Sequence, residues 1–259
     1  MRSRLAGVTF ALLTALQLAP IAPSRAQSGS PATDGSAAPT GAKAAAAPND
    51  APAPAAKASA HDPAGRKLID RVQRYYRKAK DFTATFDQLY TYVAFGRTQE
   101  ATGIVHVKRP GLLRWETNKP EKTIIVLDGK DYWQFTPEDK QVTVKRGFSS
   151  NQLSSAFTFL WGKGDLNKDF SAKAVERPAD VPGLPEGEAV ELLPREPQPS
   201  VHKLLFVVGK DGQVLASLVT DGQDNLNRLV FKGVKLNGHL KDDLFKFVPP
   251  EGANVSDLK

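Results

Sequence analysis

The chain contains 259 residues, of which 24% are charged, and it carries a formal net charge of +7. It contains no cysteine, which excludes a disulfide framework, a cysteine-ligated zinc site, a cysteine nucleophile and a lipid attached to an N-terminal cysteine. The length is compatible with one or two domains, and we expect the mature chain to be soluble.

A secretory signal peptide is predicted over residues 1–26. Arg2 and Arg4 give a positive start, the stretch Leu5–Ala22 is predominantly apolar, and a small residue, Ala26, ends a typical processing site. An uncleaved membrane anchor is the alternative. Cleavage would lower the formal net charge from +7 to +4, because these residues hold three arginines and no acidic residue. A nucleic-acid partner is therefore not expected.

A disordered linker is predicted over residues 27–61. Between Gln27 and Ala60, 28 of 34 residues are Ala, Pro, Ser, Gly or Thr, and none is Ile, Leu, Val, Met or aromatic. Such a segment has too little apolar surface to offset the entropy of ordering the chain. A passive spacer and a tether to a cell-envelope structure are the two interpretations.

One domain is predicted over residues 62–259. Asp62 and Pro63 are suited to begin a helix, and apolar residues then recur with helical spacing from Leu68 to Ala79. From Phe82 onward the period becomes two, which indicates strands. A second helix is expected over 149–161, a helical turn over 165–170 and another over 241–245. Segments with strand character cover 82–87, 103–107, 112–117, 123–127, 132–135, 141–145, 171–177, 189–193, 202–209, 214–220, 229–236 and 245–250.

This pattern favours an α+β, mainly β fold. About 10 or 11 antiparallel strands curl rather than stay flat, and a curled sheet of that size encloses space. Two amphipathic helices are available to cover the opening. We therefore expect an unclosed antiparallel β-barrel with an α-helical lid, with a packed sandwich as the alternative.

Motifs for catalysis, metal binding or cofactor binding are missing from the sequence. The four histidines, His61, His106, His202 and His239, lack the spacing of a helical metal pair. There is no GxSxG elbow, phosphate-binding loop or GxGxxG motif. We expect no enzymatic activity, no metal and no cofactor, and favour a binding or carrier role.

One segment carries a family resemblance. A glycine-led strand from Gly103 runs through the turn Lys108-Arg109-Pro110-Gly111 to Trp115, and an Asp128-Gly129-Lys130 hairpin precedes Trp133 and Phe135. The Phe82-x-x-x-Phe86 spacing and the ending Phe245–Gly252 fit as well. Together these motifs resemble the periplasmic outer-membrane lipoprotein carrier family, the LolA-like carriers.

The resemblance implies a function. It implies a periplasmic monomer whose apolar cavity shields the acyl chains of lipoproteins. The cargo would arrive from an inner-membrane lipoprotein-releasing ABC transporter and pass to an outer-membrane lipoprotein acceptor. A lipid-sensing interaction protein of the same fold and a carrier of a non-protein lipid are the alternatives.

The resemblance also implies a gating residue. Arg109 matches the family's arginine that hydrogen-bonds the lid helices, although a turn arginine that contacts only water is the alternative. Leu113 stands where well-known members have phenylalanine. Alternation alone cannot show which strand face points inward, so the cavity candidates are simply large apolar residues of the expected strands and helices. They are Val72, Tyr76, Leu113, Trp115, Ile125, Trp133, Phe135, Phe157 and Leu160.

Overall fold

The computed structural model describes residues 62–148, 164–198 and 200–258. Its elements in chain order are α2 (Pro63–Arg77), β1 (Asp81–Tyr92), η1 (Val93–Phe95), β2 (Arg97–Lys108), β3 (Leu112–Lys119), β4 (Thr123–Asp128), β5 (Tyr132–Thr136), β6 (Gln141–Lys145), α4 (Leu166–Asp169), β7 (Phe170–Val175), β8 (Glu188–Pro194), β9 (Lys203–Val208), β10 (Val214–Thr220), β11 (Leu226–Leu236), η3 (Asp242–Phe245) and β12 (Asn254–Asp257).

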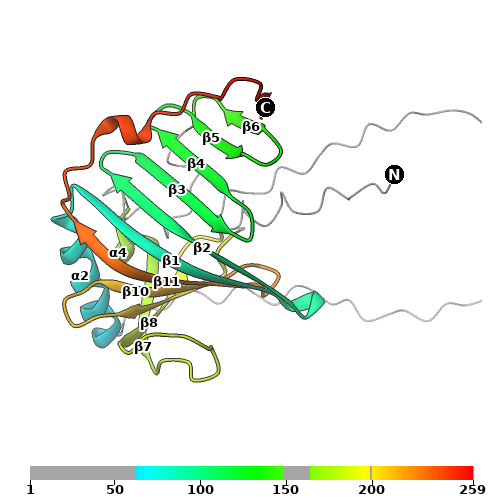
Figure 1. Cartoon of the computed structure of the whole chain (residues 1–259). Coiled ribbons are helices and arrows are strands. Elements are labelled where there is room, and N and C mark those ends of the chain that lie inside the picture. The colour runs from blue at the N-terminus through cyan, green and yellow to red at the C-terminus, as the bar shows by residue number, and fades with distance from the viewer. Residues whose placement is uncertain (1–61, 149–163, 199, 259) are drawn as a thin grey trace, which may run out of the picture. The chain divides into compact units, whose positions relative to one another are not determined.

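The strands form one 12-stranded sheet with the order β12-β6-β5-β4-β3-β2-β1-β11-β10-β9-β8-β7. Neighbouring strands are antiparallel, except that β12 pairs in parallel with β6. In the described part of the chain the two edge strands, β12 and β7, do not pair with each other. Figure 1 shows β3 to β6 running in a different direction from β7 and β8, on the other side of β1 and β2. The expected mainly β fold with an unclosed sheet is confirmed.

Helix α2 is fixed to one edge of the sheet by its N-terminus. The side chain of Asp62 caps the helix, accepting a hydrogen bond from the Gly65 N–H at 2.6 Å, and its second oxygen accepts one from the Ala174 N–H on β7 at 2.8 Å. A Cβ at Gly65 would lie 2.7 Å from the carbonyl carbon of Ala172, so glycine allows helix and strand to approach closely. The elements that α2 mainly contacts are β7, β8 and α4.

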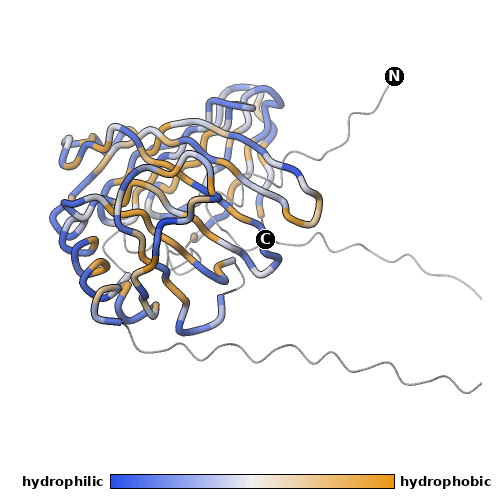
Figure 2. The backbone as a smooth tube through the Cα atoms, turned by 90° about the horizontal axis from the view of Figure 1, so that it is seen from below, coloured by the Kyte–Doolittle hydropathy of each residue, from blue (hydrophilic) through white to orange (hydrophobic). Residues whose placement is uncertain are grey.

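The sheet has two apolar faces. The face that packs against α2 is called the inner face, and its cluster includes Leu68, Val72 and Tyr76 of the helix. The opposite, outer face carries two smaller clusters, one over β8 to β11 and one over β4 to β6. Figure 2 shows hydrophobic and hydrophilic residues alternating along α2 and along the strands, as a helix or strand with one buried face requires.

The C-terminal prediction was partly wrong. The helical turn before Phe245 is present as η3, but no strand covers 245–250, and the final strand is instead β12. All four residues of β12 are exposed, so its sequence has no alternation of apolar residues that would reveal it. The last strand of the described sheet is therefore β12 and not the segment 245–250.

Other expectations fall outside the described residues. These are the signal peptide over 1–26, the linker over 27–61 and the second helix over 149–161. None of the described helices is both long enough and apolar enough to cross a membrane.

Candidate functional site

The inner face carries the largest apolar cluster in the described chain. Along β3 and β4, Leu113 pairs with Leu127 and Trp115 pairs with Ile125, and all four side chains are at most 3% exposed. Residues from α2, α4, β1 to β5 and β7 to β11 join the same cluster. The unclosed sheet thus presents a continuous apolar inner surface.

An aromatic pair lies near the middle of this surface. The rings of Phe86 and Trp115 have centroids 4.3 Å apart and planes tilted by 35°. Gly103 provides the room for Phe86, because a Cβ there would lie 2.7 Å from Phe86 Cζ. The glycine that begins the family motif is therefore a packing residue of the inner face.

Buried polar side chains follow at one end of the same face. Thr117 pairs with Thr123 one row beyond Trp115, and both are 2% exposed. On β1 and β11 the buried Gln88 donates a 2.8 Å hydrogen bond to Asn227. Because strand side chains alternate between faces, these residues lie on the same side as Trp115 and Phe86. The inner face is therefore apolar at the Leu113 end and polar at the other.

Five of the nine cavity candidates meet in the inner-face cluster: Val72, Tyr76, Leu113, Trp115 and Ile125. Tyr76 joins the helix to the sheet, because its hydroxyl accepts a 3.3 Å hydrogen bond from the Val214 N–H. Burial raises the pKa of Tyr76 above its ordinary value, so its hydroxyl stays neutral. Two other candidates, Phe157 and Leu160, lie outside the described residues.

Trp133 and Phe135 lie apart from the other described candidates. Both belong to the outer-face cluster, where Phe247 of the C-terminal segment packs at ring distances of 5.5 and 5.8 Å. Successive residues of a strand point to opposite faces, so it is Tyr132 and Gln134 that face inward. Alternation along β5 shows that Trp133 and Phe135 share one face. It could not show that this face is the outer one, because aromatic residues lie on both faces of β5.

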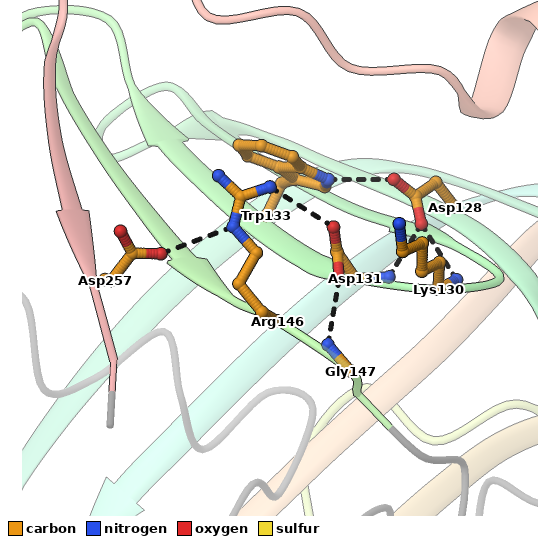
Figure 3. A network of polar contacts seen from close by, with 7 residues as sticks. All are labelled: Asp128, Lys130, Asp131, Trp133, Arg146, Gly147 and Asp257. Atoms are coloured by element: carbon orange, nitrogen blue, oxygen red, sulfur yellow. Dashed lines mark hydrogen bonds and ion pairs between the residues drawn. The ribbon is translucent and has the colours of Figure 1, made fainter.

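The Asp-Gly-Lys hairpin is a structural turn that holds Trp133 (Figure 3). Asp128 accepts hydrogen bonds from the Asp131 N–H at 2.7 Å and from the Trp133 indole N–H at 2.9 Å. Arg146 lies 4.9 Å from the centre of the Trp133 ring and bonds to Asp131 and Asp257. This network attaches β12 to the edge of the sheet.

Arg109 lies in the turn that follows β2, two residues after the inner-facing Val107. Its backbone N–H donates a 2.8 Å hydrogen bond to the Lys80 carbonyl. The side chain is half-buried, and this burial lowers the pKa of the guanidinium below its ordinary value. The structure thus places a half-buried cation in the turn that follows β2.

The site offers no metal centre. Among residues 62–148, 164–198 and 200–258 there is no group of three or more His, Cys, Asp or Glu side chains that could hold a metal ion. His106 contacts the Thr83 hydroxyl at 2.9 Å, and its neighbour along the strand, Val107, faces the inner cluster. The main feature of the site is the apolar cluster of the inner face.

Comparison with known proteins identifies the family. The family model described as outer membrane lipoprotein carrier protein LolA matches residues 77–248. The chain belongs to the LolA family. An outer-membrane lipoprotein carrier protein of Nitrosomonas europaea is 30% identical over 193 residues, covering 74% of this chain and 90% of that protein. One from Pseudomonas putida strain W619 is 30% identical over 202 residues, covering 77% and 90%.

A solved structure of a LolA superfamily protein from Nitrosomonas europaea also aligns with this member of the LolA family. It has a TM-score of 0.39 at 12% identity and covers 71% of this chain and 97% of its own. The family assignment rests on the sequence matches.

Proposed function

We propose that this LolA-family protein carries acylated lipoproteins across the periplasm and holds their acyl chains against the inner face. The observation that carries the proposal is the continuous apolar cluster on one face of an unclosed sheet. Exposing an acyl chain to water is unfavourable by about 0.8 kcal/mol for each methylene. A carrier must replace that water with apolar side chains, and this surface offers them.

The partners follow from the family's role. The cargo would be supplied by an inner-membrane lipoprotein-releasing ABC transporter and handed to an outer-membrane acceptor. The predicted signal peptide over 1–26 supports export to the periplasm. The role needs no covalent chemistry and no cofactor, so we propose a carrier rather than an enzyme, acting as a monomer.

Arg109 is proposed to control loading and release. A guanidinium offers five donors in a fixed fork and stays charged even when half-buried. Its place in the turn after β2, where its backbone N–H is bonded to the Lys80 carbonyl, suits a residue that holds a covering element by hydrogen bonds of its side chain. Loss of these side-chain hydrogen bonds would change how readily the covering element moves away from the inner face. It would not remove any apolar side chain from that face.

Two neighbouring residues of β4 test where the acyl chains bind. Ile125 faces the inner cluster and Val126 faces the outer cluster, and each is 0% exposed. Ile125→Ala and Val126→Ala should both lower stability, because each removes buried methyl groups. Only Ile125→Ala should weaken binding, by about fivefold for about 1 kcal/mol of lost apolar contact.

The measurement is displacement of an apolar fluorescent probe by a diacylated lipopeptide, with the mature wild-type chain as reference. If Ile125→Ala and Val126→Ala lose the same affinity for the lipopeptide, the acyl chains do not bind specifically on the inner face. Failure of any lipid to displace the probe would contradict the carrier function. Displacement by free lipids but not by lipopeptide would indicate a carrier of non-protein lipid or a lipid sensor.

A further inference from the structure

The indole N–H of Trp115 is a buried donor that has no acceptor among the described residues. The side chain is 1% exposed, and no hydrogen-bond partner for its Nε1 atom lies in the described part of the chain. The comparison within the same sheet is Trp133, whose indole N–H donates to Asp128 at 2.9 Å. Buried polar groups are almost always hydrogen-bonded, so the exception at Trp115 needs an explanation.

The surroundings of Trp115 restrict which acceptor could reach it. Its ring packs against Phe86, and its neighbours on the adjoining strands are Val105 and Ile125. A carboxylate or phosphate would lose its hydration among these side chains without gaining a cation, which is strongly unfavourable. A neutral carbonyl oxygen attached to an apolar chain does not meet that difficulty.

Further polar side chains of the inner face lie close to Trp115 in the sheet. Thr117 and Thr123 pair one row away, and Gln134 lies beside Ile125 in the same row as Trp115. On the other side the row formed by Val107, Leu113 and Leu127 is apolar. An amphiphile lying along the strands would therefore place its polar head toward the threonines and its hydrocarbon toward the leucines.

We infer that the Trp115 indole N–H donates a hydrogen bond to the carbonyl oxygen of an acyl ester or amide, fixing the depth at which the cargo's acyl group binds. This inference rests on the proposed carrier function and adds a carbonyl-recognition point to the apolar surface. The described residues give this donor no partner, and binding of an acyl carbonyl satisfies it. The inner face would thus distinguish acyl chains from plain hydrocarbon.

Paired probes isolate this hydrogen bond. Monopalmitoylglycerol carries an ester carbonyl, whereas hexadecylglycerol has an ether in its place. Trp115→Phe keeps an aromatic ring but removes the donor, and Trp133→Phe makes the same change on the outer face. We expect Trp115→Phe to weaken binding of the ester about fivefold to tenfold while binding of the ether changes little. Trp133→Phe should change the affinity for neither probe.

A second measurement uses the wild-type chain and does not depend on the stability of the variant. In the NMR spectrum of ¹⁵N-labelled protein, the Trp115 indole proton signal should move downfield with the ester but not with the ether. Equal weakening of both probes by Trp115→Phe, or an indole signal that responds alike to both, would overturn the inference alone. If the wild type binds neither probe, the carrier proposal fails together with it.

Discussion

Replacing Gly103 with alanine should destabilise the protein strongly, because the new Cβ has no space. It would lie 1.9 Å from the Glu116 carbonyl oxygen on β3 and 2.7 Å from Cζ of Phe86. Contacts between non-bonded heavy atoms are favourable near about 3.5 Å, so β2 and β3 would have to separate by roughly 1.5 Å. Overpacking of this kind costs about 1–3 kcal/mol, and a clash with backbone belongs at the upper end.

Urea denaturation of Gly103→Ala should therefore show a free energy of unfolding about 3 kcal/mol below that of the wild type. In a domain of this size such a loss lowers the midpoint of thermal unfolding by roughly 6–12 °C. The matched control is Gly238→Ala, whose Cβ would have Asp81 Oδ1 at 3.7 Å as its nearest neighbour. The control should stay within about 1 kcal/mol of the wild type. A Gly103→Ala variant as stable as the control would refute the packing argument.

Three further outcomes are expected. Asp62→Ala should cost about 1 kcal/mol at pH 7, because it removes the cap of α2. The bond from the Gly65 N–H lowers the pKa of Asp62 below 3.8. In the wild type the cap therefore contributes fully to stability above pH 3.8, and this contribution is lost as the pH falls through the lowered pKa. Urea denaturation of Asp62→Asn should not show this pH-dependent loss of stability. Burial lowers the pKa of His106 below 6.5, so wild-type stability should decrease as the pH drops below 6.5. An equally steep decrease in the stability of His106→Gln would contradict this role of His106. Arg109→Leu should keep the wild-type circular dichroism spectrum but transfer an acylated lipoprotein to its acceptor about tenfold more slowly, whereas normal transfer would exclude a gating role.

Local patterns predicted much of the fold. Asp62 and Pro63 mark the start of α2, and the alternation from Phe82 to Phe86 follows the buried positions of β1. Turn signals such as Asp128-Gly129 separate strands that pair as expected. These features depend on residues close together in the chain. The strand β12 escaped prediction because it is held by pairing with the distant β6 and has no buried side chain of its own.

The candidate site was predictable only in part. Trp115, Leu113 and Ile125 were found as large apolar residues of the family motif, and the structure places them together. Trp133 and Phe135 satisfied the same criterion but lie on the outer face. In β5 both faces carry aromatic residues, so hydrophobicity could not distinguish them.

By itself the sequence determined the family, the sheet-rich fold and which residues of a strand share a face, because these depend on local periodicity and turn chemistry. Only the tertiary structure decided which face is inward, since that follows from where α2 packs and from Phe247 covering Trp133 across more than a hundred residues of chain. It also decided that the indole of Trp115 has no acceptor in the described chain while that of Trp133 has one. Hydrogen-bond partners that are remote in sequence meet only when the sheet has formed.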